Sequence, residues 1–197
     1  MTNEILNAIQ TRRSVRSFKG TQIENDTLSA VIEAGRVAPS GVNIQACHMI
    51  VLQNNEKLTQ IAKIIFEQLS SLDENNPIHS NYKHAIARSK SAGESYNFFY
   101  GAPTLIITAN KESNPNAFSD CACVLENMMI AATSLNIGSC WINQPRWLDH
   151  NAAVRGFFSD IGLKDDEIIC GALALGFPAS DIPAPPEKKG NPVTYVK

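Results

Sequence analysis

The feature that most constrains this chain is the segment FSDCACVLENMMIAATSLNIG, residues 118–138, which is apolar around nearly the whole circumference of a helix. A helix with one apolar stripe buries one side, whereas a helix that is apolar all round is buried on most of its sides. We therefore expect a central buried helix in this segment. Gly138 follows its last apolar turn, at a position typical of a helix C-terminal cap.

Other segments have the periodicity of elements that would cover such a helix. Apolar side chains recur at helical spacing in four segments, which we expect to be helices: residues 3–12, 24–39, 56–71 and 149–162. Asp149 is placed to cap the last of these helices. Short apolar runs predict four strands, at residues 47–53, 104–110, 139–143 and 167–178. Helices that cover a central mixed sheet of about four to five strands give an α+β, or mixed α/β, fold.

The domain organisation is expected to be simple. The chain has 197 residues and no internal repeat, which predicts one domain over residues 1–197. The polar stretch 71–98 has no sustained apolar period and predicts a flap or lid, in which we expect His79 and His84 to be exposed rather than ligands. The proline-rich C-terminal extension, residues 178–197, ends in VTYV, which alternates like a strand that pairs with a sheet edge on another subunit.

Composition and charge exclude several classes of protein. The net charge of -2 and the sequence pI near 6.1 argue against a general nucleic-acid binder, whose surface would be basic over a whole face. The start of the chain is polar and apolar runs are short, so we expect neither a secretory signal nor a membrane span. Five cysteines, an odd number, fit a reducing cytoplasm better than a disulfide framework. The closest pair, Cys121 and Cys123, favours small buried hydrophobes over a metal or redox site.

Several common catalytic motifs are absent from the sequence. It contains no G-x-G-x-x-G after a strand, no G-x-x-x-x-G-K-[ST], no H-E-x-x-H, no C-x-x-C and no G-x-S-x-G elbow. No two carboxylates have a spacing that singles them out as an acid/base pair. An enzyme without an obvious nucleophile, base or metal usually takes its reactivity from a cofactor.

Three stretches have residue types suited to binding a ligand. TRRSVRSF, residues 11–18, offers arginine forks and hydroxyls that suit a phosphate, but cations at a helix end explain it equally well. APSGVNIQ, residues 38–45, presents amides and a hydroxyl that suit the edge of a heterocycle such as a flavin, or forms an ordinary polar turn. LNIGSCWIN, residues 135–143, carries Trp141, which either lines a ligand or packs in the core.

Taken together and in this order, the three stretches resemble the nitroreductase family of FMN-dependent oxidoreductases. The family pattern has R-R-S-x-R-x-F, then A-P-S-x-x-N-x-Q, then a G-x-C-W-I-like segment after a long apolar helix, and FFYGAPTLIIT and LALGFP match it as well. The resemblance covers the chain from residue 4 to about 196. It implies a nitroreductase-like sheet and a homodimer that exchanges C-terminal tails and binds two FMN molecules at its interface.

The resemblance also implies which residues hold FMN, with no catalytic side chain and no metal. The phosphate and ribityl chain would be held by Arg12, Arg13, Ser14 and Arg16, completed by Lys188 or Lys189 of the tail. The isoalloxazine would be framed from the partner subunit by Pro39, Ser40, Gly41, Asn43 and Gln45. From the first subunit it would be lined by Trp141, Ile142 and Asn143. Where many relatives have Gln-Pro-Trp, this chain has Gln45-Ala46-Cys47, which makes that corner smaller and softer.

The expected activity follows from the cofactor. The resemblance implies ping-pong transfer, in which NADH or NADPH reduces FMN and a nitroaromatic, quinone or similar flat acceptor is then reduced. One alternative is a specialised flavin-dependent dehydrogenase or dehalogenase on the same scaffold. Another, of a different class, is a flavin-binding protein without turnover.

Overall fold

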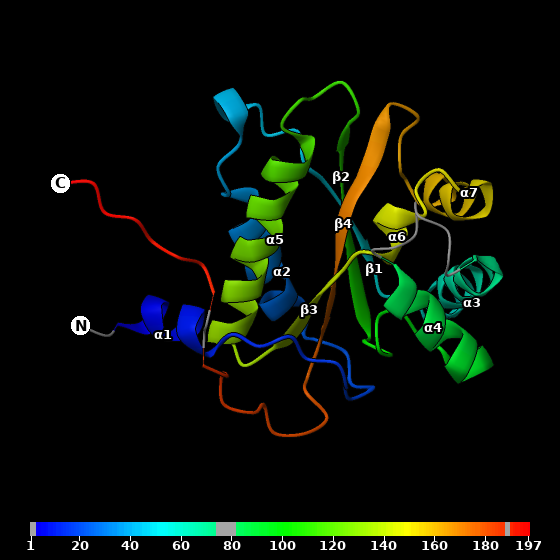
Figure 1. Cartoon of the computed structure of the whole chain (residues 1–197), viewed down its shortest axis with the longest axis horizontal. Helices are drawn as coiled ribbons and strands as arrows, with labels where there is room; N and C mark the ends of the chain where they lie inside the picture. Colours follow the sequence, from blue (N-terminus) through cyan, green and yellow to red (C-terminus); the bar gives the residue numbers. More distant parts are fainter. Residues whose placement is uncertain (1–2, 74–81, 188–189) are drawn as a thin grey trace.

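The computed structural model describes residues 3–73, 82–187 and 190–197, and its centre is a four-stranded sheet with helices on both faces (Figure 1). The strands run in the order β1-β2-β4-β3: β1 (His48–Leu52), β2 (Thr104–Lys111), β4 (Glu167–Gly176) and β3 (Gly138–Ile142). All three strand pairs are antiparallel, and an isolated parallel bridge joins Ser14 to Ser139. The predicted α+β fold with about four strands is confirmed, but the sheet, predicted to be mixed, is antiparallel in all three of its strand pairs.

Both faces of the sheet are buried, which explains why its two central strands are apolar without a break. Successive side chains of a strand point to opposite faces. Ile106 of β2 and its partner Leu173 of β4 lie in one apolar cluster, whereas the adjacent pair, Ile107 and Ala172, lies in the other. A sheet covered on both sides therefore needs apolar residues at every position of its central strands.

One face is covered by α5 (Ala117–Ser134), behind which lie α2 (Asn25–Arg36) and α1 (Glu4–Thr11) (Figure 1). The predicted central helix is confirmed as α5, since its Leu125 and Met128 are fully buried. Helix α2 approaches α5 closely at Gly35, where a β-carbon would lie 2.9 Å from Met128 Cγ. A larger residue at this position would push the two helices apart.

The opposite face is covered by four helices (Figure 1): α3 (Asn55–Ser71), α4 (Lys83–Ala92), α6 (Gln144–Trp147) and α7 (Ala152–Asp160). Two short 3-10 turns complete the regular structure of the described residues, η1 (Gly41–Asn43) and η3 (Gly93–Ser95). The stretch 71–98, predicted to be a flap with a partial helix, contains α4. His84 is exposed on α4 as predicted, and His79 lies outside the described residues. None of the described helices is both long and apolar enough to cross a bilayer.

Two local predictions were wrong. Gly138 does not cap α5, because Asn136 takes the left-handed conformation there (φ 58°) and Gly138 instead begins β3. Asp149 does not cap α7, because Asn151 accepts hydrogen bonds from Ala153 N and Val154 N, while Asp149 accepts one from Arg155 Nη1 at 3.0 Å. Residues 193–196 form no strand within one chain and their apolar side chains are exposed, so their pairing with another subunit stays a prediction.

A buried carboxylate links β1 and β4, the two strands that lie on either side of β2. Glu167 of β4, only 4% exposed, accepts a hydrogen bond from His48 Nδ1 of β1 at 2.9 Å and one from Lys164 N at 3.1 Å. Burial alone would raise the pKa of Glu167, but the hydrogen bonds from His48 and Lys164 and their charges lower it below the ordinary value. The folded state therefore favours the ionised carboxylate.

This link makes a prediction about acid stability. Glu167→Gln should lower the free energy of unfolding at pH 7 by about 1.5–3 kcal/mol, the usual worth of hydrogen bonds to a charged group. Because the folded pKa is the lower one, wild type has this advantage above the ordinary carboxyl pKa of about 4.3 and loses it as the pH falls through the folded value. Chemical denaturation from pH 7 to pH 3 measures the difference.

Asp160→Asn is the matched control, since Asp160 is an exposed carboxylate at the end of α7. Its effect should stay within about 0.5 kcal/mol at every pH. A difference between wild type and Glu167→Gln that is the same at pH 7 and pH 3 would contradict the role given to the carboxylate.

Candidate functional site

The basic segment that follows α1 is held in an extended conformation beside β3. Helix α1 ends where Arg12 leaves the helical region, with φ -52° and ψ 129°. Val15 N then donates to Ser139 O at 2.9 Å, and Lys19 N donates to Phe177 O at 2.8 Å. Alternate residues of an extended chain point to opposite sides. Val15 is buried, so its neighbours in sequence are directed away from the core.

The guanidinium groups of this segment are not saturated by protein carboxylates. Arg12 Nε lies 3.9 Å from Glu126 Oε1, a long contact between partly exposed side chains. Arg13 Nε is buried and has no hydrogen-bond partner within the described part of the chain, and the same holds for Oγ of Ser139, the residue that bridges to Ser14. Arg16 is exposed. Buried donors are normally paired, so this arrangement lacks an acceptor.

An open cavity of about 250 Å³ lies against the same segment and is bounded on its other side by the start of the C-terminal extension. Arg13, Ser14 and Arg16 line it from the basic segment, and residues 180–183 line it from the extension. Arginine forks and hydroxyls that converge on one hollow suit an anion with several oxygen atoms. Lys188 and Lys189, also predicted to reach this site, lie outside the described residues.

The polar loop 38–45 has an unusual backbone. Val42, Asn43 and Gln45 have positive φ values of 47°, 54° and 51°. Non-glycine residues rarely adopt this region, and a β-branched residue there is a genuine outlier. The Val42 side chain is also 99% exposed. Strain of this kind persists only where the surrounding structure enforces it.

Buried polar contacts hold the loop in this shape. Gly41 N donates to Asp120 Oδ1 of α5 at 2.9 Å, and Gln45 N donates to Ser40 Oγ at 3.0 Å. Asp120 is 5% exposed, and its second oxygen accepts from Asn114 Nδ2 at 3.1 Å. A β-carbon at position 41 would lie 2.4 Å from Asn116 Nδ2, so a larger residue there would displace the exposed Asn116 side chain.

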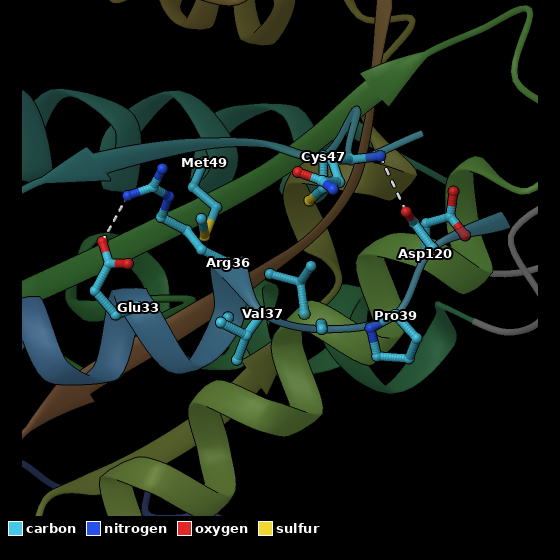
Figure 2. Close-up of a pocket in the computed structure, with 12 residues that line it drawn as sticks. Glu33, Arg36, Val37, Pro39, Cys47, Met49 and Asp120 are labelled. Atoms are coloured by element: carbon cyan, nitrogen blue, oxygen red, sulfur yellow. Dashed lines mark hydrogen bonds and ion pairs between the residues drawn. The ribbon is translucent and has the colours of Figure 1, made fainter. Parts of the chain in front are cut away.

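Figure 2 shows the cavity at the base of this loop, about 310 Å³ in volume. It lies between the end of α2, the loop and the first turns of α5, and Arg36 on its rim pairs with Glu33 at 2.8 Å. Pro39, Cys47 and Asp120 line it. This hollow is separate from the cavity at the basic segment.

The third predicted stretch is split between surface and core. Trp141 is half-buried, and its Nε1 donates to Asn143 Oδ1 at 2.9 Å, which fixes the indole ring. Ile142 is 2% exposed and packs in the cluster on the opposite face of the sheet. Only the backbone of Ile142 is therefore placed to meet a ligand, while Trp141 and Asn143 offer side chains.

Within one chain, the structure brings together two of the three stretches. Ser14 bridges to Ser139, two residues before Trp141, so the basic segment and the end of β3 are neighbours. The loop 38–45 lies instead at the N-terminal end of α5 (Figure 1). From Asp120 to Thr133, which lines a cavity with Arg13 near the other end of α5, the helical rise gives a separation of ~20 Å.

Sequence reasoning missed a group of residues next to Arg16. The Arg16 and Arg88 guanidinium carbons lie 6.0 Å and 5.5 Å from the centroid of the Tyr100 ring. The backbone of Tyr100 has a positive φ of 60°. With Tyr96 and Asn97 they line a cavity of about 580 Å³. Burial raises the pKa of Tyr96, although Gln144 Nε2 donates to its hydroxyl at 3.2 Å. The dipeptide Tyr100-Gly101 is typical of a turn, but no sequence pattern indicates that Tyr100 lies next to Arg88.

The whole chain is similar to proteins of one family. The model of the family described as "Nitroreductase family" matches residues 9–177. The crystal structure of a nitroreductase with bound FMN from Bacteroides fragilis is 35% identical, with a TM-score of 0.88 and full coverage of both chains. A 4-nitrobenzoate reductase of Pseudomonas putida is 25% identical over 90% of this chain and 86% of its own length. An FMN reductase (NAD(P)H) of Bacillus subtilis is 28% identical over 73% of this chain and 55% of its own length.

The anchoring of the loop by Asp120 can be tested directly. Asp120→Ala removes the acceptor for Gly41 N, so the Gly41 amide should exchange with deuterium about 10–100-fold faster, the equivalent of 1.5–3 kcal/mol for a charged acceptor. Mass spectrometry of peptides spanning residues 38–47 measures the exchange. Asp120→Asn keeps an acceptor oxygen and should show a smaller increase. Ser119→Ala, an exposed change in the same turn of α5, should show none. Unchanged protection in Asp120→Ala would sink the assignment.

Proposed function

This chain belongs to the nitroreductase family, and we propose that it is an FMN-dependent oxidoreductase that uses NADH or NADPH to reduce nitroaromatic, quinone or similar flat acceptors. The observation that carries the proposal is the basic segment beside β3, whose Arg13, Ser14 and Arg16 line an open hollow and whose buried Arg13 Nε has no hydrogen-bond partner among the described residues. The proposal is supported along the full length of the chain by the likeness to a nitroreductase with bound FMN.

The residues present fit the phosphate of FMN. Arg13 and Ser14 line the hollow with a guanidinium fork and a hydroxyl, and Arg12, which precedes them and does not line it, has only a long contact of 3.9 Å with Glu126. A phosphate monoester carries about two negative charges and several acceptor oxygens, which match a set made of donors. We assign Arg12, Arg13 and Ser14 to the phosphate and ribityl chain, with Lys188 or Lys189 as the further cation predicted from the tail.

The ring would lie over the end of β3. Trp141, held by Asn143, offers an aromatic surface of fixed orientation, and Arg16 and Arg88 bring positive charge to the adjoining cavity around Tyr100. When bound there, FMN supplies two-electron transfer between a nicotinamide and an acceptor. The chain itself then binds, orients and desolvates its ligands. No titrating side chain of the described residues is needed for a proton at the ring.

The first test is retention of the cofactor. Arg12→Ala/Arg13→Ala should raise the Kd for FMN about 100-fold or more, because two charged hydrogen-bonding groups worth about 1.5–3 kcal/mol each are lost. The protein should purify without its yellow colour, and titration with FMN measures the affinity. The matched control, Lys19→Ala/Lys111→Ala, removes two exposed positive charges and should stay yellow.

Anaerobic addition of NADH and NADPH to the yellow protein then tests turnover. Bleaching of the flavin absorbance, followed by its return when a nitroaromatic or a quinone is added, is the expected result. A protein that reduces only one narrow class of acceptor would be the specialised dehydrogenase or dehalogenase. A protein whose flavin neither nicotinamide reduces would be the flavin-binding alternative, and the enzymatic proposal would be wrong.

We also propose that the site is completed by a second copy of this chain. Within one chain the loop 38–45 is ~20 Å along α5 from the basic segment, by the helical rise. A two-fold dimer could bring one subunit's loop, including its Pro39, Ser40, Asn43 and Gln45, to the other subunit's basic segment. Exposed apolar side chains lie in the places such a dimer would cover: Ile5 (66%), Ile9 (48%), Val42 (99%) and Tyr195 (81%). Tail exchange would cover the last of these.

The dimer makes its own prediction. Light scattering after size exclusion should give about twice the chain mass of 21.5 kDa. Ile5→Asp/Ile9→Asp should weaken dimerisation about 100-fold or more, since burial of each aliphatic side chain is worth about 1.5–3 kcal/mol. The control, Asn7→Asp/Gln10→Asp, adds the same charge to exposed polar positions of α1 and should leave the mass unchanged. A flavin-loaded monomer in the wild type would overturn this part of the proposal.

The proposed location is the cytoplasm. All five cysteines are free thiols, in keeping with a reducing compartment. NADH and NADPH are the donors that the proposed reaction requires.

A further inference from the structure

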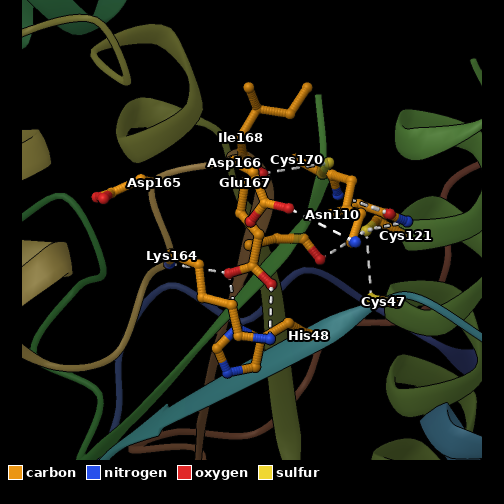
Figure 3. A network of polar contacts seen from close by, with 12 residues as sticks. Cys47, His48, Asn110, Cys121, Lys164, Asp165, Asp166, Glu167, Ile168 and Cys170 are labelled. Carbon is orange, nitrogen blue, oxygen red and sulfur yellow. Dashed lines mark hydrogen bonds and ion pairs between the residues drawn. The ribbon is translucent and has the colours of Figure 1, made fainter. Parts of the chain in front are cut away.

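Three of the five cysteines converge at the sheet edge beneath the loop 38–45 (Figure 3). Cys47 precedes β1, Cys121 lies on α5 and Cys170 lies on β4, so each comes from a different element. Cys121 Sγ and Cys47 Sγ lie 3.2 Å apart, within hydrogen-bonding distance for two sulfur atoms. A disulfide needs about 2.05 Å between the sulfur atoms, so the two are about 1.2 Å from bonding distance.

The two sulfur atoms differ in their access to solvent. Cys121 is fully buried, whereas Cys47 is half-buried and lines the 310 Å³ cavity of Figure 2. A small oxidant in this cavity would therefore meet Cys47 first, with Cys121 directly behind it. A second thiol placed directly behind the reactive one can resolve its oxidised form to a disulfide.

The surroundings favour a thiolate within the cluster. The pKa of Cys121 is lowered to about 4, because S–H groups of Cys170 and Cys47 can donate to its sulfur, with a further weak contact from Asn110 Nδ2 at 3.9 Å. The pKa of Cys47 is raised by its hydrogen bond with Cys121 and by burial, so Cys47 keeps the proton in the resting state. Transfer of that proton across the 3.2 Å contact exchanges the two roles.

The other chemistries open to a thiol cluster are less well supported. No group of three or more histidine, cysteine or carboxylate side chains among the described residues is arranged to hold a metal ion. Cys123, two positions along α5, does not join the cluster, which shows that the sequence pair Cys121 and Cys123 is not the redox unit. The partner of Cys121 is Cys47, which comes from a different segment of the chain.

We propose that Cys47 and Cys121 form a peroxide-sensitive dithiol that closes reversibly to a disulfide. After the proton of Cys47 has passed to Cys121, the Cys47 thiolate attacks one oxygen of hydrogen peroxide, the O–O bond breaks, and the departing hydroxide takes the Cys121 proton and leaves as water. The Cys121 thiolate then attacks Cys47 Sγ, the S–S bond forms, the S–O bond breaks, and the departing hydroxide takes a proton from solvent to form the second water. Two thiols lose two electrons in total, and one peroxide is reduced to two waters.

The disulfide would tie the base of the loop 38–45 covalently to α5. The loop's other anchor to α5 is the hydrogen bond from Gly41 N to Asp120, so oxidation would add a second, covalent anchor. This consequence rests on the proposed function, in which the loop frames the flavin of the partner subunit. Formation of the disulfide itself does not depend on the flavin.

The experiment treats the purified full-length protein with stoichiometric hydrogen peroxide, with and without added FMN, and then alkylates the remaining thiols. Mass spectrometry should show a loss of about 2 Da and a cross-linked peptide pair containing Cys47 and Cys121, both reversed by dithiothreitol. This pair should oxidise about tenfold faster than Cys123, which supplies an internal reference. Protein without FMN should still form the disulfide, so failure of the flavin proposal is seen separately.

Two variants and a control complete the design. Cys47→Ala and Cys121→Ala should each abolish the cross-link, and Cys123→Ala should leave it unchanged; thermal melts confirm that all three fold. In Cys121→Ala, Cys47 should stop at a sulfenic acid that a dimedone probe labels. A Cys47–Cys170 cross-link in the wild type, oxidation of Cys47 to sulfinic acid without a cross-link, or no reaction faster than Cys123 would each overturn the proposal.

Discussion

The packing of α5 against β2 and β4 is the interaction on which the rest of the structure depends. Leu125 and Met128 of this helix are fully buried in the same cluster as Ile106 and Leu173 of the central strands. Because the helix is fixed along its length, its two ends are fixed in space as well. Asp120 near one end holds the polar loop, and Glu126 and the residues after the other end lie beside the basic segment. The same core therefore sets the distance between the two halves of the proposed site.

The loop 38–45 has a strained backbone whose cost is offset by hydrogen bonds to the rest of the structure. Each non-glycine residue in the left-handed region costs about 1–3 kcal/mol, and Val42, Asn43 and Gln45 are all there. Asp120 and Ser40 offset this cost with hydrogen bonds to backbone N–H groups. In the described part of the chain the Val42 side chain is left 99% exposed despite this strain. A second subunit that buries Val42 would account for both the strain and the exposure.

The sequence predicted most of the architecture because its strongest signals come from burial. The segment around Leu125 and Met128 was identified as a central helix, and the apolar runs at β2 and β4 as strands, since both patterns follow from solvent exclusion alone. The helix ends were predicted less well. At the end of α5, Asn136 rather than Gly138 takes the left-handed position, and at the start of α7, Asn151 rather than Asp149 is the cap. Which residue takes each position depends on where the next strand or helix begins.

The candidate site could be predicted only in part, for a different reason. Arg12, Arg13 and Trp141 lie in motifs of a known order, so the sequence identifies them. Arg88, Tyr100 and the Cys47–Cys121 contact depend on residues that the fold brings together from distant positions. A 74-residue separation leaves no local pattern for a thiol pair. Only the sheet order, which places β1 and β4 on either side of β2, makes that neighbourhood visible.

The start of β1, which follows the loop, makes contacts on both faces of the sheet. Consecutive residues at the start of β1 point to opposite sides, so Cys47 faces α5 while His48 reaches Glu167 at 2.9 Å. The buried carboxylate restrains the strand at His48. A change in bonding at Cys47 is therefore taken up by the residues before it rather than by β1. The loop, which carries three residues in strained conformations, is the softer side of this junction. Oxidation of the thiols would act on the segment proposed to meet the flavin, and the sheet would stay as it is.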